Sequence, residues 1–209
     1  MKFENCYFFT GTGYAGKSTL VKRLAEKYGG IACEENYHDV LLDTLDKKEF
    51  PNLCYTRDLR DWHDFVRRSP DEYENWIRNV SKECETLELR ILKDLIPKGK
   101  KIFVDTNISV ETLRKISDDR HVLVMLADPE ITVKRFFERE DREKQFLYRL
   151  IMEEKEPRKA LENFRHCLER VNSPEIYDAF LHCGFPVLLR DENRTPEQTA
   201  ELAETILDL

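Results

Sequence analysis

The sequence predicts an α/β protein in the form of a three-layer sandwich, with a five-stranded parallel sheet between layers of helices. Short apolar runs alternate along the chain with segments of helical periodicity, which is the pattern of strand–helix units. Two of these runs, KIFVD and HVLVMLA, are apolar on both faces, as strands are when helices cover both sides of a sheet. A glycine-rich stretch, GTGYAGKS, follows the first run and precedes an amphipathic segment.

The predicted strands lie at Phe3–Thr10, Gly30–Cys33, Lys101–Asp105, His121–Ala127 and Pro186–Arg190. The clearest helix begins at Ser69, where a cap residue, a proline and two acids precede a stripe of apolar residues at helical spacing. The same start recurs at residues 128–130, 173–175 and 195–198. We expect a single domain, residues 1–209, with a long helical insert at about residues 40–97.

Composition and charge exclude several classes of protein. The chain has 209 residues, enough for one well-buried core, and a net charge of −7. A polyanionic partner needs a basic face, so this charge argues against broad binding to nucleic acid. The apolar run near the N-terminus is too short to span a membrane, and the six cysteines form no C-x-x-C pair. We therefore expect a cytoplasmic protein with reduced thiols and no membrane partner.

The stretch GTGYAGKS fits two phosphate-binding patterns at once. Gly11, Gly13 and Gly16 match the G-x-G-x-x-G fingerprint of dinucleotide-binding folds. Gly11, Gly16, Lys17 and Ser18 match the P-loop pattern G-x-x-x-x-G-K-[ST]. The first pattern would indicate an NAD-dependent dehydrogenase, and the second would indicate nucleoside triphosphate chemistry.

Two observations favour the P-loop. In a P-loop the ammonium group of Lys17 reaches the β- and γ-phosphates and the hydroxyl of Ser18 binds Mg²⁺, whereas a dinucleotide site gives neither residue a task. The long insert also departs from the short crossovers of a dinucleotide fold, although Glu34 and Glu35 could supply its ribose-binding carboxylate. The residues expected to cradle the phosphates are Gly11, Thr12, Gly13, Tyr14, Ala15, Gly16, Lys17, Ser18 and Thr19.

With these motifs the chain resembles the small P-loop kinases, the group that includes nucleoside monophosphate, shikimate and gluconate kinases. The stretch GTGYAGKST is similar to their phosphate loop, and IFVDTN is similar to their third strand with its terminal acid. The resemblance implies ATP and Mg²⁺ as cofactors, with Asp105 holding Mg²⁺ through water or orienting the nucleophile. It also implies that Asn193 and Arg194, in the stretch LLRDENRTPEQ, contact the adenine edge; a plain turn before the helix is the alternative.

A lid is expected at about residues 135–149, because basic residues recur there on or just after one helix. Phosphoryl transfer needs cations that approach the transferring group and exclude water. Arg139 and Arg142 are the candidates for catalysis, beside Arg135 and Lys144. The alternative is a solvated helix with charge pairs along one face.

The acceptor is expected to bind over the helical insert. Asp39, just past the second strand, could accept the proton of the acceptor hydroxyl, or could cap a helix that starts at Val40. Four arginines favour an anionic acceptor, although interspersed aspartates fit a solvated helix face equally well. They are Arg57, Arg60, Arg67 and Arg68. Aromatic residues could form a wall for a base or sugar, or serve as helical core: Trp62, Phe65, Tyr73 and Trp76.

Tyr14 departs from the family pattern, which usually has glycine at this position. Its N–H can still bind phosphate, so we expect the ring to point away from the phosphates. The ring would then either pack on the insert or edge the acceptor pocket, and we favour the second. The expected function is transfer of the γ-phosphate of ATP to a small hydroxyl- or phosphate-bearing metabolite or nucleotide. A non-catalytic ATP-binding switch is the main alternative, and an NAD-dependent dehydrogenase is a remote one. The sequence leaves the oligomeric state open.

Overall fold

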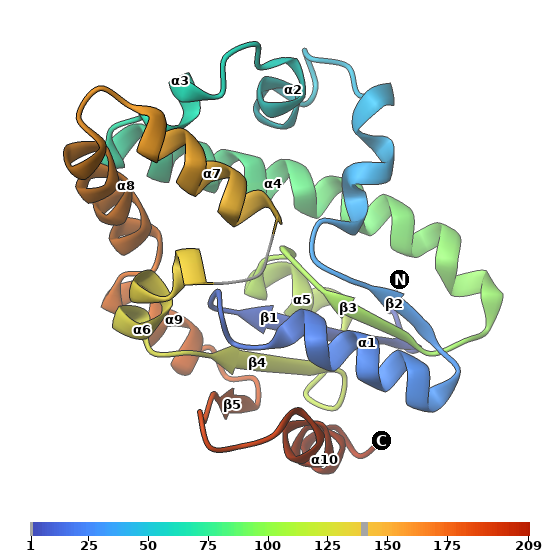
Figure 1. Ribbon diagram of the computed structural model, residues 1–209. Helices are drawn as coiled ribbons and strands as arrows, with labels where there is room; N and C mark the ends of the chain where they lie inside the picture. The colour runs from blue at the N-terminus through green and yellow to red at the C-terminus, as the bar shows by residue number, and fades with distance from the viewer. Residues whose placement is uncertain (1, 139–141) are drawn as a thin grey trace.

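A computed structural model describes residues 2–138 and 142–209. Its centre is a five-stranded parallel sheet, as the sequence predicts, and the strands lie in the order β2-β3-β1-β4-β5 (Figure 1). The strands are β1 (Cys6–Gly11), β2 (Ile31–Cys33), β3 (Ile102–Asp105), β4 (Val122–Leu126) and β5 (Val187–Leu189). All residues of β3 and β4 are buried, which explains why their sequences are apolar on both faces. The first strand begins later than predicted, because the chain turns from Phe3 into Cys6.

The helices and 3₁₀ segments between the strands fall into several groups along the chain. The first part of the chain has α1 (Lys17–Tyr28), η1 (Tyr37–Thr44), α2 (Pro51–Asp58), α3 (His63–Val66), α4 (Pro70–Leu95) and η2 (Ile96–Lys98). The second part has α5 (Val110–Ile116), α6 (Pro129–Lys134), η3 (Phe136–Glu138), α7 (Arg142–Glu153), α8 (Pro157–Val171), α9 (Pro174–Leu181) and α10 (Pro196–Leu207).

Helices cover both faces of the sheet. On one face, apolar residues of α1 and α10 pack on the side chains of Phe9, Phe103 and Leu123. On the other face, α5, α9 and the C-terminal half of α4 pack on Phe8 and Val104. Figure 1 shows α1 in front of the sheet and α10 below it. The predicted three-layer arrangement is therefore confirmed.

A second, helical core lies beside the sheet. The two segments that interrupt the strand–helix alternation pack against each other here, through α3, α4, α7 and α8 (Figure 1). Aromatic rings dominate this core, with Phe65 and Phe164 both packed against Tyr73. A smaller cluster joins η1 and α2 to α4. The long insert is thus a helical layer supported by α4, which reaches from this core to the sheet.

The predicted helix starts are confirmed where a proline follows a cap residue. Ser69 and Glu72 form a capping box at the start of α4, and Ser173 caps α9. The interpretation of Asp39 as a cap is wrong. The segment η1 already begins at Tyr37, and its N-cap is Asn36, so Asp39 lies within its first turn.

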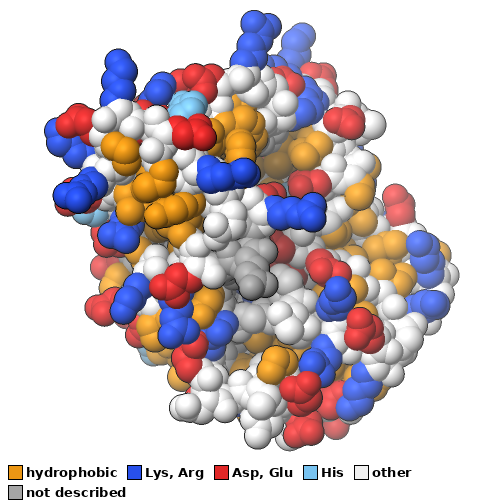
Figure 2. All heavy atoms as spheres, viewed as in Figure 1, with side chains coloured by type: hydrophobic (Ala, Val, Ile, Leu, Met, Phe, Trp, Pro, Cys, Tyr) orange, Lys and Arg blue, Asp and Glu red, His pale blue; other side chains and the backbone are white. Residues whose placement is uncertain are grey.

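The surface and the cysteines agree with the composition. On the face in Figure 2, basic and acidic side chains of the described residues are interspersed rather than separated. All six cysteines are buried free thiols, and burial raises the pKa of Cys6 to about 12. Within the described part of the chain, no helix combines the length and the apolar character needed to cross a bilayer.

Candidate functional site

The glycine-rich stretch Gly11–Ser18 forms the turn between β1 and α1, and we call it the P-loop. It lies at the carboxyl end of β1, at the sheet edge where open parallel sheets bind ligands. Gly11 has a φ of 122°, and a Cβ there would collide with the carbonyl oxygen of Met125. Gly16 has a φ of 91° and directly precedes the first turn of α1. Because the first amides of a helix lack intrahelical partners, this geometry presents N–H groups to an anion.

Lys17, Ser18 and Asp105 come together at the base of the P-loop. The ammonium of Lys17 donates to the carbonyl oxygen of Thr12 at 2.9 Å and lies 3.9 Å from Asp105 Oδ1. Ser18 Oγ donates to Asp105 Oδ2 at 2.6 Å. Asp105 is the last residue of β3, which neighbours β1, so the sheet order itself places this carboxylate beside the loop.

Burial raises the pKa of Asp105 above its ordinary value, and the charge of Lys17 and the hydrogen bond from Ser18 oppose that shift. Its side chain is only 7% exposed. A carboxylate that is costly to desolvate, next to a hydroxyl and an ammonium, is suited to a cation. The Ser18 hydroxyl oxygen and the Asp105 carboxylate oxygens are hard ligands of the kind that Mg²⁺ prefers. Ser18 and Asp105 therefore fit this ion. Among the described residues, no cluster of three or more His, Cys, Asp or Glu side chains could hold a metal ion.

Lowering the pH should stabilise this protein relative to the Asp105→Asn variant. The folded protein binds the Asp105 proton more tightly than the unfolded chain, which titrates near 3.8. The ionised carboxylate of Asp105 therefore destabilises the folded protein. This destabilisation is complete above the folded pKa of Asp105 and disappears as the pH falls through that pKa toward 3.8. Urea unfolding at a series of pH values measures this difference. Parallel pH profiles for the two proteins would show that Asp105 carries no such shift.

Glu88 of α4 lies directly behind the end of β3 and is completely buried. Its carboxylate accepts hydrogen bonds from Thr106 Oγ1 at 2.6 Å and from Asn107 Nδ2 at 2.8 Å. The backbone N–H of Asn107 also donates to it. These bonds fix the two residues that follow Asp105, so Glu88 holds the turn that positions the Asp105 carboxylate. The sequence interpretation missed Glu88.

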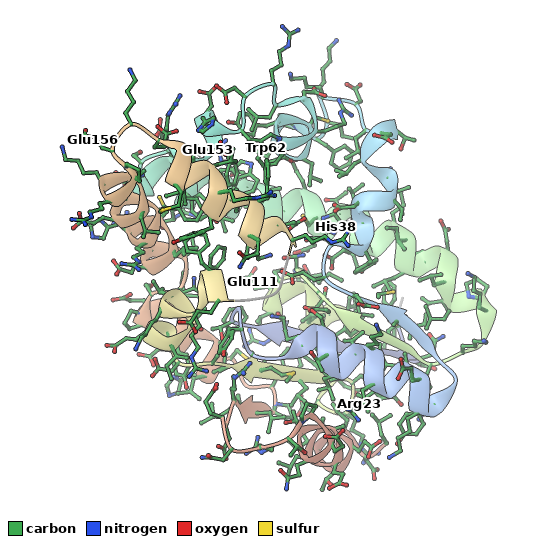
Figure 3. The ribbon with its side chains drawn as sticks, in the orientation of Figure 1. Arg23, His38, Trp62, Glu111, Glu153 and Glu156 are labelled. Atoms are coloured by element: carbon green, nitrogen blue, oxygen red, sulfur yellow. The ribbon has the colours of Figure 1, made fainter. Side chains whose placement is uncertain are left out.

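His38 lies between Glu88 and the predicted base Asp39. Figure 3 shows His38 at the foot of η1, where the chain leaves β2 for the helical layer. Its Nδ1 lies 3.5 Å from Glu88 Oε1, and its Nε2 lies 3.7 Å from Asp39 Oδ1. Asp39 is half-exposed; partial burial raises its pKa, the charge of His38 opposes this, and the charge of Glu143 adds to it.

The P-loop separates two cavities. The first, of about 180 Å³, lies between the P-loop, α1 and the segment after β5. Its lining includes Thr19, Arg190, Glu192 and Arg194. The guanidinium of Arg194 donates to the carbonyl oxygen of Leu189 at 3.1 Å, and its contact with adenine stays a prediction. Asn193 is not part of the described lining of this cavity. It borders a shallower groove along α10.

The second cavity, of about 290 Å³, lies between the P-loop and the helical layer. One wall is aromatic, with Phe65, Tyr73, Trp76 and Phe136. Its polar lining consists of Glu35, Asn36, Thr132, Glu143, Lys144 and Asn172. Gly13 and Tyr14 form the wall on the P-loop side. Three of the four aromatic residues named from the sequence thus line this cavity, whereas Trp62 packs on Phe65 and Phe146.

The arginines of the insert do not line the second cavity. Arg57 donates to the carbonyl oxygens of Leu42 and Leu45, and Arg60 is exposed. Arg67 pairs with Glu154 at 2.9 Å. Arg68 stacks on aromatic rings on the outer side of the layer, with its guanidinium carbon 4.2 Å from the centroid of Tyr55. The cation in the described lining is instead Lys144, a buried residue of α7.

The residues of the predicted lid differ in their positions and contacts. Arg135 donates to the Tyr14 hydroxyl at 2.9 Å and pairs with Glu192 at 2.6 Å. Arg142 is exposed at the start of α7. Arg139 lies outside the described residues. The catalytic roles of Arg139 and Arg142 therefore stay predictions.

In comparisons with known proteins, no family model matches this chain and no curated protein is significantly similar to it. The observed strand order separates β1 from β2 by β3. Dinucleotide-binding folds keep their first two strands adjacent in the order 3-2-1-4-5-6, so the order found here disfavours the dehydrogenase interpretation.

Proposed function

We propose that this protein is an ATP-dependent phosphotransferase that moves the γ-phosphate of ATP to a small acceptor in the second cavity. The observation that carries the proposal is the position of the P-loop. It lies between two cavities, with Lys17, Ser18 and Asp105 gathered at its base. A phosphoryl group held on the loop would have the donor nucleoside on one side and the acceptor on the other.

The donor would occupy the P-loop and the first cavity. The amides from Gly13 to Thr19 and the ammonium of Lys17 would bind the phosphates, and the base would lie near Arg190 and Arg194. Ser18 and Asp105 would hold Mg²⁺, which when bound would neutralise charge on the β- and γ-phosphates.

The acceptor would lie against the aromatic wall of the second cavity. Such a wall favours an acceptor with a flat or apolar part. Lys144 could pair with an anionic group on the acceptor, although it lies 3.5 Å from Glu143 and Glu35 adds a second carboxylate to the lining. In the transfer, an acceptor oxygen bonds to the γ-phosphorus while the bond to the β–γ bridging oxygen breaks and ADP leaves. The acceptor proton passes to a carboxylate. Asp39 is the base predicted from the sequence, but Glu35 is the carboxylate after β2 that lines the cavity.

The test is ADP release with MgATP against a panel of nucleosides, nucleoside monophosphates, sugar acids and polyols. An acceptor should raise the rate of ADP release above the ATPase background, with a phosphorylated product detectable by mass spectrometry. The variants Asp39→Asn and Glu35→Gln, compared with that acceptor, identify the base by the larger loss of kcat. ATP binding without transfer to any acceptor would instead support a nucleotide-binding switch. Failure to bind ATP would overturn the proposal.

A further inference from the structure

Tyr14 has a backbone conformation that glycine adopts more easily. Its φ is 62°, in the left-handed region where a side chain causes strain. Among the described non-glycine residues only Asn36 and Asp208 share a positive φ. Strain of this kind persists where surrounding contacts hold it, and such sites cluster where ligands bind. The contacts of the Tyr14 ring therefore need an explanation.

Among the described residues, two arginines from distant parts of the chain contact the Tyr14 side chain. Arg190, just after β5, places its guanidinium carbon 3.8 Å from the ring centroid. It also donates a hydrogen bond to the Tyr14 carbonyl oxygen. Arg135, between α6 and η3, donates to the Tyr14 hydroxyl at 2.9 Å. Glu192 connects these arginines, with distances of 2.6 Å to Arg135 Nη1 and 2.6 Å to Arg190 Nε.

This network reaches both cavities. Arg190 and Glu192 line the first cavity, and Tyr14 lines the second. A planar guanidinium stacks on aromatic rings, so Arg190 is positioned to respond to a nucleobase in the first cavity while it contacts Tyr14. The Tyr14 ring in turn forms part of the surface that an occupant of the second cavity would meet.

We infer that Tyr14 is a positioning residue that couples the two cavities, so that a nucleotide in the first cavity changes the shape and accessibility of the second. This inference rests on the proposed function, because it takes the first cavity as the site of the donor base. The bound nucleotide would hold the Arg190 guanidinium in one position, and Arg190 would hold the Tyr14 ring through their stacking contact. The position of the ring then determines the shape of one wall of the acceptor cavity. Because coupling between two binding sites is reciprocal, an acceptor should also tighten the binding of the nucleotide.

The experiment uses Trp76 as the reporter of the second cavity. The chain has two tryptophans, so the Trp62→Phe variant leaves Trp76 alone. Trp76 lines the second cavity and not the first, as far as the described residues show. Quenching of its fluorescence by acrylamide is measured with and without a non-hydrolysable ATP analogue and Mg²⁺. Trp76 also borders a groove on the outer side of the helical layer, which gives a background common to all variants.

Three further variants are made in that background. Tyr14→Phe keeps the ring and removes only the hydroxyl contact with Arg135. Tyr14→Gly removes the ring and the strain together. Asp208→Gly is the matched control, because it relieves the same kind of backbone strain at the C-cap of α10. Binding of the analogue to each variant is measured separately by calorimetry.

The nucleotide is expected to reduce quenching of Trp76 in the parent, in Tyr14→Phe and in Asp208→Gly. Tyr14→Gly should bind the nucleotide, but the nucleotide should no longer reduce the quenching of Trp76 in this variant. If the nucleotide binds but Trp76 responds equally in Tyr14→Gly, or in none of the proteins, the coupling is refuted and the proposed function still stands. If no protein binds the nucleotide, both the proposed function and the coupling are refuted.

Discussion

The Lys17→Ala variant is expected to lose phosphoryl transfer by a factor of about 10² to 10³, the usual effect of removing one group that stabilises the transferred charge. The Lys17 side chain is 16% exposed, and its ammonium donates to the Thr12 carbonyl oxygen and lies 3.9 Å from Asp105 Oδ1. It is therefore already placed where phosphate oxygens would arrive. Initial rates of ADP release, with the acceptor found in the panel, measure the loss.

The matched control is Lys22→Ala, which removes an exposed lysine from the same helix. It should leave turnover unchanged, because its charge is solvated. Calorimetry with MgATP separates the effect of Lys17 on binding from its effect on the chemical step. Turnover in Lys17→Ala equal to that of the control would contradict the assignment of residues 11–18 as a phosphate-binding loop.

The Glu88→Leu variant should be the most destabilised of the single substitutions considered, by about 3 kcal/mol. Leucine fills a similar volume but leaves the hydroxyl of Thr106 and both N–H groups of Asn107 without their buried acceptor. The loss comes mainly from the buried Thr106 hydroxyl, which would have no acceptor, because Asn107 is exposed and water can reach it. The midpoint and slope of urea unfolding give the change in the free energy of unfolding.

Glu85→Leu is the control for Glu88→Leu, on the same helix. Glu85 also accepts hydrogen bonds, from the Ser109 N–H at 2.9 Å and the Thr112 hydroxyl at 2.5 Å. It is partly exposed, so water can replace it, and a loss of about 1 kcal/mol or less is expected. Equal losses for the two variants would mean that the buried network behind β3 does not stabilise the fold.

Much of the fold could be predicted because its signals are local. The apolar runs of β3 and β4 and the proline starts of α4, α9 and α10 depend on residues a few positions apart. The P-loop pattern is also a local signal, since Gly11, Lys17 and Ser18 lie in one short stretch between β1 and α1, but its binding of phosphate stays a prediction. The strand ending in Asp105 could be named from the sequence, but its place beside β1 comes from the observed sheet order.

The contacts around the site could not be predicted, because they join distant segments. Arg135 and Arg190 meet Tyr14 across 121 and 176 residues of chain. Glu88 is a polar residue in an amphipathic helix, and only the turn after β3 explains its burial. The sequence could not show that Arg57 binds backbone carbonyls, because a charge pattern does not reveal such contacts, and an anionic acceptor stays a prediction.

The central claim is that residues 11–18 hold the triphosphate of a donor nucleotide between two cavities. A crystal structure with a non-hydrolysable ATP analogue and Mg²⁺ tests it most directly. The phosphates should lie on the P-loop amides with Lys17, the metal should lie at Ser18 and Asp105, and the base should occupy the first cavity beside Arg194. The second cavity should remain open beyond the γ-phosphate. Nucleotide bound elsewhere, or with its base in the second cavity, would contradict the claim.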